Sequence, residues 1–513
     1  MLKPNRGTIA AGNQKTAAAG IEMLQLGGNA FDAAVAAVLA SFVTESTLTS
    51  AAGGGFLLAH TQNNENILFD FFSQTPHSKQ LQSNLNFYPV NINFGNAIQE
   101  FHIGLGAMAV PGNIGGIFHV HKKLGSLPFE VVAEPAIHYA KTGVKLEEFQ
   151  HYSASILEPI ISASSEMKNV YAPNGQSLKT GETFFMKDFA NTLAYLVEAG
   201  VQEFYQGEIA HQLVKDCQEK GGYLTFEDLK SYQVIERQPL IVNYRNNLLL
   251  TNPSPSSGGI LIAFALELLA KVDLTNIEFG SSEHLQILTE IMRLTNAARK
   301  DKYNSNIYQE SIEKTFLSAE HIDVYEQQLT NTVNKWGSTT HISVIDAEGN
   351  AASTTTSHGE GCGYVIPGTG IMMNNMLGEE DLNPHGFHQW QENVRISSMM
   401  SPTIVLKNNQ PEIALGSGGS NRIRTAILQV ISNIIDFKMP VDIAVNSPRI
   451  HWENNILNVE PEFSQEVANL ANDRLILWNK QNMFFGGVHT AMEFDGIITG
   501  AGDRRRNGAI ASI

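Results

Sequence analysis

Alternating side chains predict a β-hairpin between residues 339 and 357. The first strand alternates polar and apolar residues, and the second strand is rich in Ser and Thr. The residues between them, Ala347-Glu348-Gly349, are typical of a turn. If the turn is centred on Glu348, Thr339 lies opposite Ser357 on one face, with Cβ atoms roughly 5 Å apart. Two adjacent hydroxyls at a strand end can form a site, but a Thr-rich exposed strand face is the second interpretation.

Apolar residues spaced three and four apart predict helices elsewhere. One helix runs from Thr16 to Leu26, after which Asp32 is expected to cap an Ala-rich helix. Residues 127–235 have a helical pattern and are predicted to form a helical lobe. Another amphipathic helix is marked by apolar residues at Ile423, Ile427, Val430, Ile431 and Ile434. Because strands and helices occur in mixed order, we expect an α+β fold in which helices cover sheets.

Two glycine-rich loops precede predicted helices. Gly418-Gly419 lies at the start of the helix marked by Ile423. Exposed backbone N–H groups and a helix dipole at that place would suit an oxyanion hole. A strand-to-helix turn that simply needs glycine explains the same residues. The loop over residues 252–259 admits the same two interpretations.

Composition and charge restrict the class of protein. The 513 residues are 43% hydrophobic and 17% charged, which is typical of a compact globular enzyme. The net charge of −17 argues against nucleic acid as a partner, and the short run Arg504-Arg505-Arg506 is interpreted as a local ion-pairing or capping group. Two cysteines, a start without an apolar leader, and no apolar stretch long enough to span a bilayer predict a cytoplasmic protein without membrane contact.

A hydroxyl nucleophile at Thr339 needs a base. No His–Asp pattern near it marks a catalytic triad, and His341 is expected to be a packed or hydrogen-bonded imidazole. Cleavage of the chain before Thr339 would free an α-amino group with a pKa of roughly 7.7–8.0, which suits general base catalysis near neutrality. Nucleophile and base would then belong to one residue.

An ordered set of motifs covers nearly the whole chain. It comprises Leu26-Gly27-Gly28-Asn29-Ala30 with Asp32-Ala33-Ala34-Val35, Gly53-Gly54-Gly55-Phe56, Val110-Pro111-Gly112, Glu203-Phe204-Tyr205, Gly221-Gly222 with Asp228-Leu229, Pro255-Ser256-Ser257-Gly258-Gly259, Thr339-Thr340-His341 with Asp346 and Gly349-Asn350, Asn374-Asn375, and Met400-Ser401-Pro402-Thr403. With these motifs the sequence resembles the γ-glutamyltranspeptidase family, N-terminal nucleophile hydrolases that cleave themselves before a Thr. The resemblance implies a four-layer αββα sandwich with a helical lobe.

The resemblance also assigns roles to the reacting residues. Ser338 and Thr339 match the two sides of the cleavage bond, and Thr339 matches the nucleophile. Ser357 stands where the family has a second Thr that assists the nucleophile. Gly418-Gly419 matches the glycines of the oxyanion hole, although the loop lacks the family's usual Pro. The implied mechanism passes an acyl group from the substrate to Thr339, and then to water or an acceptor amine, without a cofactor or metal.

Cleavage would divide one domain into two associated chains. The proenzyme, residues 1–513, would give a large chain, 1–338, and a small chain, 339–513. Because the two are expected to stay interleaved, the cut is not a domain boundary.

The residues with which the family recognises glutamate are changed. They are Phe72 for an Arg that binds the α-carboxylate, Gly359 for an Asn, Met376 for a Gln, and Glu379 for an Asp, whose charge it is expected to keep. Of two serines on the carboxylate side, Ser398 aligns and the next is Met399; a shift of one residue would use Ser397 and Ser398. An aromatic ring does not replace a bidentate Arg contact, so we expect an altered acyl pocket.

Three functions are compatible with this pattern. The first is γ-glutamyl transfer or hydrolysis on glutathione-like substrates. The second is hydrolysis of a different small acyl amide, such as an oxamate or another acylase substrate, which the changed recognition residues favour. The third is an uncleaved pseudoenzyme that acts as a binding protein. His385 and His388, three residues apart, and the glycines of 359–370 lack further ligand or phosphate-loop patterns, so we expect no metal and no nucleotide.

Overall fold

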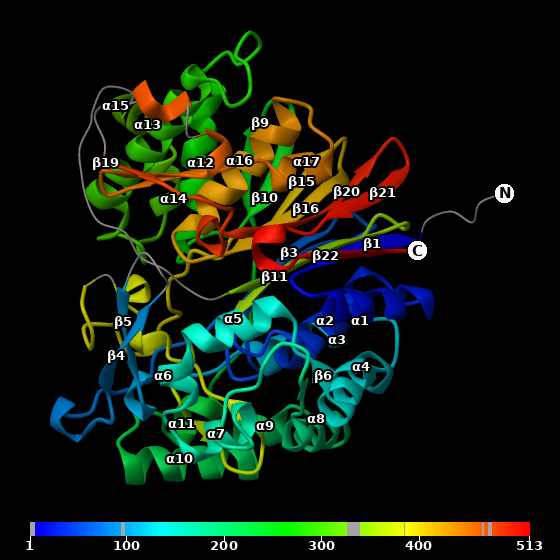
Figure 1. The fold of residues 1–513 in the computed structure, drawn as a ribbon, viewed down its shortest axis with the longest axis vertical. Helices are drawn as coiled ribbons and strands as arrows, with labels where there is room; N and C mark the ends of the chain where they lie inside the picture. The colour runs from blue at the N-terminus through cyan, green and yellow to red at the C-terminus, as the bar shows by residue number, and fades with distance from the viewer. Residues whose placement is uncertain (1–5, 94–97, 326–338, 384, 464–465, 470–473) are drawn as a thin grey trace.

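Two β-sheets stacked face to face form the centre of the molecule (Figure 1). The computed structural model describes residues 6–93, 98–325, 339–383, 385–463, 466–469 and 474–513. The first sheet has seven strands in the order β22 (Ala509–Ser512), β1 (Gly7–Ala11), β11 (Thr340–Asp346), β12 (Ala351–Ser357), β2 (Gly54–His60), β3 (Asn66–Phe71) and β8 (Ile235–Arg237). The second has six strands in the order β21 (Ile497–Ala501), β20 (Gly487–Phe494), β16 (Gln410–Gly418), β15 (Thr403–Lys407), β10 (Asn247–Thr251) and β9 (Leu240–Tyr244).

Helices cover the outer face of each sheet. Helices α1 (Gln14–Gln25) and α2 (Ala30–Thr44) pack on the first sheet, and α12 (Ser257–Ala270) and α16 (Arg422–Ile435) pack on the second. Strands β11 and β12 contact β16 and β20 across the interface between the sheets. Figure 1 shows the two pairs of helices on opposite sides of the stacked sheets. The predicted αββα sandwich is therefore confirmed.

Shorter elements fill the connections. The segment between β3 and β8 carries α3 (Asn113–Leu124), α4 (Phe129–Thr142), α5 (Glu148–Ile156), α6 (Glu158–Ile161), α7 (Ser165–Tyr171), α8 (Lys187–Ala199), α9 (Gln202–Gln206), α10 (Glu208–Lys220) and α11 (Phe226–Lys230). The other helices are α13 (Ser282–Ala298), α14 (Ile312–Phe316), α15 (Ala319–Tyr325) and α17 (Val441–Asn446). Small sheets pair β4 (Tyr88–Asn93) with β5 (Ile98–Ile103), β6 (Val144–Lys145) with β7 (Thr183–Phe184), β13 (Val365–Ile366) with β14 (Ile371–Met372), and β18 (Ile456–Val459) with both β17 (Ile450–Glu453) and β19 (Arg474–Leu477). Among the described helices, none is both long and apolar enough to cross a membrane.

The Ala-rich helix α2 begins differently from the prediction. All of its residues are buried, because small side chains let it pack closely against the first sheet, α1 and α4. Its N-cap is Asn29, whose side chain accepts hydrogen bonds from the backbone N–H groups of Phe31 and Asp32. The Asp32 carboxylate accepts the Asn29 N–H in return, at 3.0 Å. Asp32 as the N-cap was therefore wrong, since it is the third helical residue of a capping box.

The predicted hairpin is confirmed with its register. Strands β11 and β12 pair antiparallel from Thr340 with Thr356 to Ile345 with Ala351. In the turn, the Asp346 carboxylate accepts the Asn350 N–H at 2.8 Å. Every residue of β12 is buried, because the strand lies between β11 and β2 and faces the second sheet. An exposed Thr-rich strand face is therefore excluded as the explanation of this sequence.

Candidate active site

Thr339 lies at the start of β11, inside the molecule. Thr339 is 5% exposed. Because Thr340 pairs with Thr356, continuing the register by one residue brings Thr339 opposite Ser357. Ser338 lies outside the described residues. The carbonyl oxygen of Thr339 accepts a hydrogen bond from Arg506 Nη1 at 3.1 Å. The backbone of the predicted nucleophile is thus fixed by a buried cation.

Gly418 and Gly419 lie directly beside the backbone of Thr339. Strand β16 ends at Gly418, and α16 begins at Arg422, so the predicted strand-to-helix turn is present. A Cβ added at Gly418 would lie 2.1 Å from the carbonyl oxygen of Thr339. Gly419 has φ +123°, which a residue with a side chain rarely adopts. Glycine is therefore required by the turn and also by the close approach to Thr339. Stabilisation of an oxyanion by this loop stays a prediction.

Ser357 ends β12 and faces the glycine-rich turn before β2. Its hydroxyl accepts the backbone N–H of Gly359 at 3.0 Å. A Cβ added at Gly53 would lie 2.2 Å from the Ser357 carbonyl oxygen, so the three-glycine motif lets two backbones meet at this point. The hydroxyl expected to assist Thr339 is held in place by backbone groups.

His341 is a hydrogen-bonded core residue, as expected. It is fully buried, with Nδ1 2.8 Å from Thr355 Oγ1 and Nε2 2.8 Å from Ser343 Oγ. Burial lowers the pKa of His341 well below its usual range, and nearby His489 acts in the same direction. Both ring nitrogens have hydroxyl partners, so this imidazole is not placed as the base for Thr339.

Sequence reasoning missed two charged residues beside Thr339. The first is Arg506, which was assigned with its neighbours to local ion pairing. That interpretation is confirmed for Arg505, which binds Glu460 and Asp503, but Arg506 reaches the nucleophile instead. The second is Glu45, whose carboxylate lies 2.5 Å from Thr340 Oγ1. Sequence separations of 167 and 295 residues hide both contacts.

The predicted recognition residues Gly359 and Glu379 are in contact with each other. A Cβ added at Gly359 would lie 2.0 Å from Glu379 Oε1, so the longer carboxyl side chain fills the place of the missing one. Burial raises the pKa of Glu379 well above its usual range, and the like charges of Glu360 and Asp381 add to this. Burial and two neighbouring carboxyl groups thus oppose the negative charge that Glu379 was expected to keep, and that charge stays a prediction.

Three apolar residues occupy the other changed positions. Phe72, Met376 and Met399 belong to one buried hydrophobic cluster. The ring of Phe72 stacks on Phe56 with centroids 5.4 Å apart. Nearby Arg395 does not stand in for the family's Arg, because its Nη1 and Nη2 bind the carbonyl oxygens of Phe72 and Gln233 and its Nε faces Asp70.

The loop that contains Ser397 and Ser398 packs against the start of α12. The Ser398 carbonyl oxygen accepts the backbone N–H of Ser257 at 2.7 Å, and its hydroxyl accepts the Met400 N–H at 3.1 Å. A Cβ added at Gly258 would lie 2.1 Å from the Met399 carbonyl oxygen. Gly258 therefore serves close packing against this loop, whereas a Cβ added at Gly259 would lie 2.1 Å from the carbonyl oxygen of Asn252. Of Ser397 and Ser398, it is Ser397 that lines a cavity, and its hydroxyl is 2.9 Å from that of Ser257.

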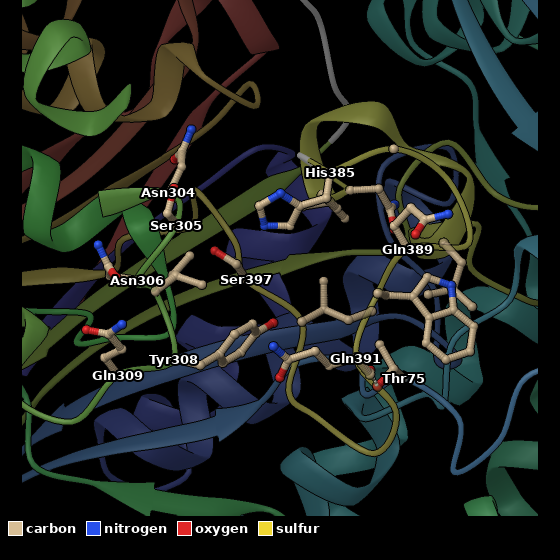
Figure 2. Close-up of a pocket in the computed structure, with 17 residues that line it drawn as sticks. Thr75, Asn304, Ser305, Asn306, Tyr308, Gln309, His385, Gln389, Gln391 and Ser397 are labelled. Carbon is tan, nitrogen blue, oxygen red and sulfur yellow. Dashed lines mark hydrogen bonds between the residues drawn. The ribbon is translucent and has the colours of Figure 1, made fainter. Parts of the chain in front are cut away.

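This cavity has a volume of about 460 Å³. Its walls come from Thr75, from residues 304–309 and from residues between 377 and 397, next to the recognition residues. Figure 2 shows side chains of Tyr308, Gln391, His385 and Ser397 among those around it. None of the described residues that line it is Asp, Glu, Lys or Arg, and amide and hydroxyl groups supply most of their polar atoms. The cavity thus suits an uncharged, hydrogen-bonding group.

The two weaker ligand candidates have other structural roles. His388 Nδ1 is 2.9 Å from the hydroxyl of Tyr223, whereas His385 lines the cavity. Among the described residues, no group of three or more His, Cys, Asp or Glu is arranged to hold a metal ion. The glycines of 359–370 all have positive φ, from +66° to +83°, so they are needed for left-handed backbone.

Comparison with known proteins agrees with this arrangement. The family model described as gamma-glutamyltranspeptidase matches residues 16–513. The glutathione hydrolase proenzyme of Escherichia coli K12 is 30% identical over 506 residues, covering 91% of this chain and 85% of that protein. The Acylase ACY 1 proenzyme of Pseudomonas sp. V22 is 27% identical, covering 99% of this chain and 94% of that protein.

A solved structure has the same fold. The cephalosporin acylase from Bacillus halodurans superposes with a TM-score of 0.87 at 24% sequence identity, over 99% of this chain and 96% of that chain. The family model covers nearly the whole chain. The chain belongs to the gamma-glutamyltranspeptidase family.

Proposed function

We propose that the chain is a proenzyme that cleaves itself before Thr339 and then hydrolyses a small amide whose acyl group carries no glutamate-like carboxylate. The apolar cluster at Phe72, Met376 and Met399 carries this proposal, because it fills the positions of polar recognition residues. The raised pKa of Glu379 and the cavity beside Ser397, whose described lining has no Asp, Glu, Lys or Arg, support it further. Among the described residues that line this cavity, no Lys or Arg is present to replace the water shell of a free carboxylate.

The reaction proceeds in two steps. The Thr339 hydroxyl attacks the amide carbonyl carbon while its proton passes to the freed α-amino group. Backbone N–H groups of the Gly418-Gly419 turn face the developing oxyanion. The amine takes the proton and leaves, so that the acyl group is bound to Thr339 as an ester. Water then attacks this ester, the α-amino group takes its proton, and the acid and the Thr339 hydroxyl are released.

Both sheets support association of the two cleaved chains. Strand β11, from the small chain, lies between β1 and β12, and β12 lies beside β2 of the large chain. In the second sheet, β15 of the small chain pairs with β10 of the large chain. Separation would break ladders in both sheets and expose the core between them, so the chains are expected to stay together as one domain.

γ-Glutamyl transfer or hydrolysis is the second candidate. Membership of the family favours it, as does the glutathione hydrolase from E. coli among the relatives. Ser398 keeps a serine of the carboxylate side, although its hydroxyl already accepts the Met400 N–H. In either candidate reaction, the acyl group on Thr339 is passed to water in hydrolysis or to an amine in transfer.

Two measurements test the proposal. Denaturing gels and intact mass should show two chains with Thr339 as a free N-terminus, whereas Thr339→Ala should remain one 56.2 kDa chain. Turnover of a γ-glutamyl anilide is then compared with that of the 4-aminobutyryl anilide, which lacks only the α-carboxylate. We expect similar kcat/KM values, within about threefold. A loss of about 10- to 150-fold without the carboxylate would show a charge-assisted contact and favour the γ-glutamyl enzyme. A single inactive chain would leave the pseudoenzyme.

A cytoplasmic location is the remaining proposal. Both cysteines, Cys217 and Cys362, are free and buried, and burial raises the pKa of each thiol to about 12. Such thiols are compatible with a reducing compartment. Fractionation of expressing cells with an antibody to the small chain tests the location, and recovery outside the cytoplasm would contradict it.

A further inference from the structure

A buried carboxyl group supports the strand that begins at Thr339. Glu45 follows the last residue of α2 and is 1% exposed. Its Oε2 lies 2.5 Å from Thr340 Oγ1, and its Oε1 lies 2.7 Å from Thr16 Oγ1. Thr16 Oγ1 is also 2.7 Å from Thr44 Oγ1. Glu45 therefore connects α1 and α2 to the first residue of β11.

The peptide unit between Thr339 and Thr340 is held from two directions. Arg506 Nη1 binds the carbonyl oxygen of Thr339, and Glu45 binds the side chain of Thr340. The charges of Glu45 and Arg506 also attract each other, since each shifts the pKa of the other toward the ionised form.

We propose that Glu45 is a positioning residue for Thr339: as a carboxylate it fixes Thr340 and, through Arg506, keeps the Thr339 backbone against Gly418. The inference rests on the proposed function, because it concerns the same nucleophile. Glu45 does not touch the reacting atoms. Its effect on the reaction is exerted through the placement of the strand end.

The charge of Glu45 is sensitive to pH near neutrality. Burial raises its pKa to about 7; the hydroxyls of Thr340 and Thr16 and the Arg506 charge oppose this, and Glu147 adds to it. Above about pH 7 the carboxylate accepts both hydroxyl donors and attracts Arg506. Below that pH the neutral acid loses the attraction and must donate one of its own hydrogen bonds. The carboxylate form of Glu45, which positions Thr339, therefore becomes the main form as the pH rises above about 7.

The test compares the pH dependence of kcat in Glu45→Gln with that in the wild type. From about pH 8 to about pH 6, protonation of the Thr339 α-amino group alone lowers activity about tenfold per pH unit below its pKa. The wild type should fall more steeply, because Glu45 is protonated as well. Glu45→Gln should follow the single-proton slope, with kcat about tenfold lower at pH 8 and KM within about twofold.

A second variant tests the mechanism without touching Glu45. Glu147→Gln removes a like charge that raises the pKa of Glu45. In this variant, the pH at which kcat falls should therefore be lower than in the wild type by a few tenths of a unit. Glu348→Gln, on the exposed hairpin turn, is the matched control and should shift nothing. Equal slopes for Glu45→Gln and the wild type, or no shift in Glu147→Gln, would overturn the inference while the proposed function stands. A wild type that neither cleaves nor turns over substrate would overturn both, and the gel shows this independently.

Discussion

Replacing Gly418 with alanine places a methyl group where the backbone of Thr339 lies. The added Cβ would be 2.1 Å from the Thr339 carbonyl oxygen and 2.9 Å from its carbonyl carbon. Real Cβ contacts are essentially never shorter than 3.0 Å, so one backbone must move by about 1 Å. The carbonyl group cannot move freely because Arg506 binds it. Gly418 is in strand β16 without a positive φ, so the clash is the only strain that alanine introduces.

This displacement determines the expected magnitude. A misplacement of about 1 Å in a catalytic group costs on the order of 100-fold in rate, which corresponds to about 2.7 kcal/mol in the activation free energy. Overpacking of this kind lowers the free energy of unfolding by about 1–3 kcal/mol. We therefore expect Gly418→Ala to fold, to cleave itself slowly and to retain about 1% of the wild-type kcat.

The assay follows self-cleavage on denaturing gels, kcat on an anilide substrate and the melting temperature. Gly175→Ala is the control: nothing lies within 4 Å of its added Cβ, but φ is +76°. It should lose about 1 kcal/mol of stability through its left-handed backbone and keep full activity. Wild-type cleavage and turnover in Gly418→Ala would refute the close approach of Gly418 to Thr339 as a determinant of catalysis.

Three further predictions concern the same region. Ser357→Ala should lower kcat about tenfold through loss of one hydroxyl hydrogen bond, whereas Ser357→Thr should retain activity; equal kcat values in all three proteins would contradict an assisting role. Phe72→Arg should lower the free energy of unfolding by about 3 kcal/mol or more, because it buries a charge in the apolar cluster. Phe72→Leu should lower it by less than about 1.5 kcal/mol. A stable Phe72→Arg protein that gains a preference for γ-glutamyl substrates would refute the core position of the ring. Because the pKa of Glu45 is raised from 4.5 to about 7 on folding, its stabilising contribution is complete below about pH 4.5 and is lost as pH rises through about 7. Relative to Glu45→Gln, the wild type should therefore lose about 3 kcal/mol across this range, measured from urea unfolding at each pH, and parallel curves would contradict the raised pKa.

Local patterns predicted the elements on which the site is built. Alternation and turn residues give the hairpin and its register, because side-chain direction in a strand has a period of two. Asp32 shows the limit of local reasoning at helix ends. It is a good cap residue, but Asn29 three positions earlier completes a capping box and begins the helix sooner.

Contacts between distant segments could not be predicted in the same way. The sequence offered an interpretation of Arg506 as an ion-pairing residue, which is correct only for its neighbour Arg505. Likewise, the raised pKa of Glu379 follows from its burial and from nearby Glu360, and no spacing in the sequence reveals this environment.

By itself, the sequence determined that the chain has a hairpin with facing hydroxyls and a glycine turn before a helix. These depend on the order of side chains along the backbone, which is local information. Only the tertiary structure decided that Glu45 and Arg506 meet at Thr339, and that Phe72, Met376 and Met399 share one core. The physical reason is that burial and charge act through space. A carboxyl or guanidinium group acquires its protonation and its partner from whatever the packed sheets bring beside it.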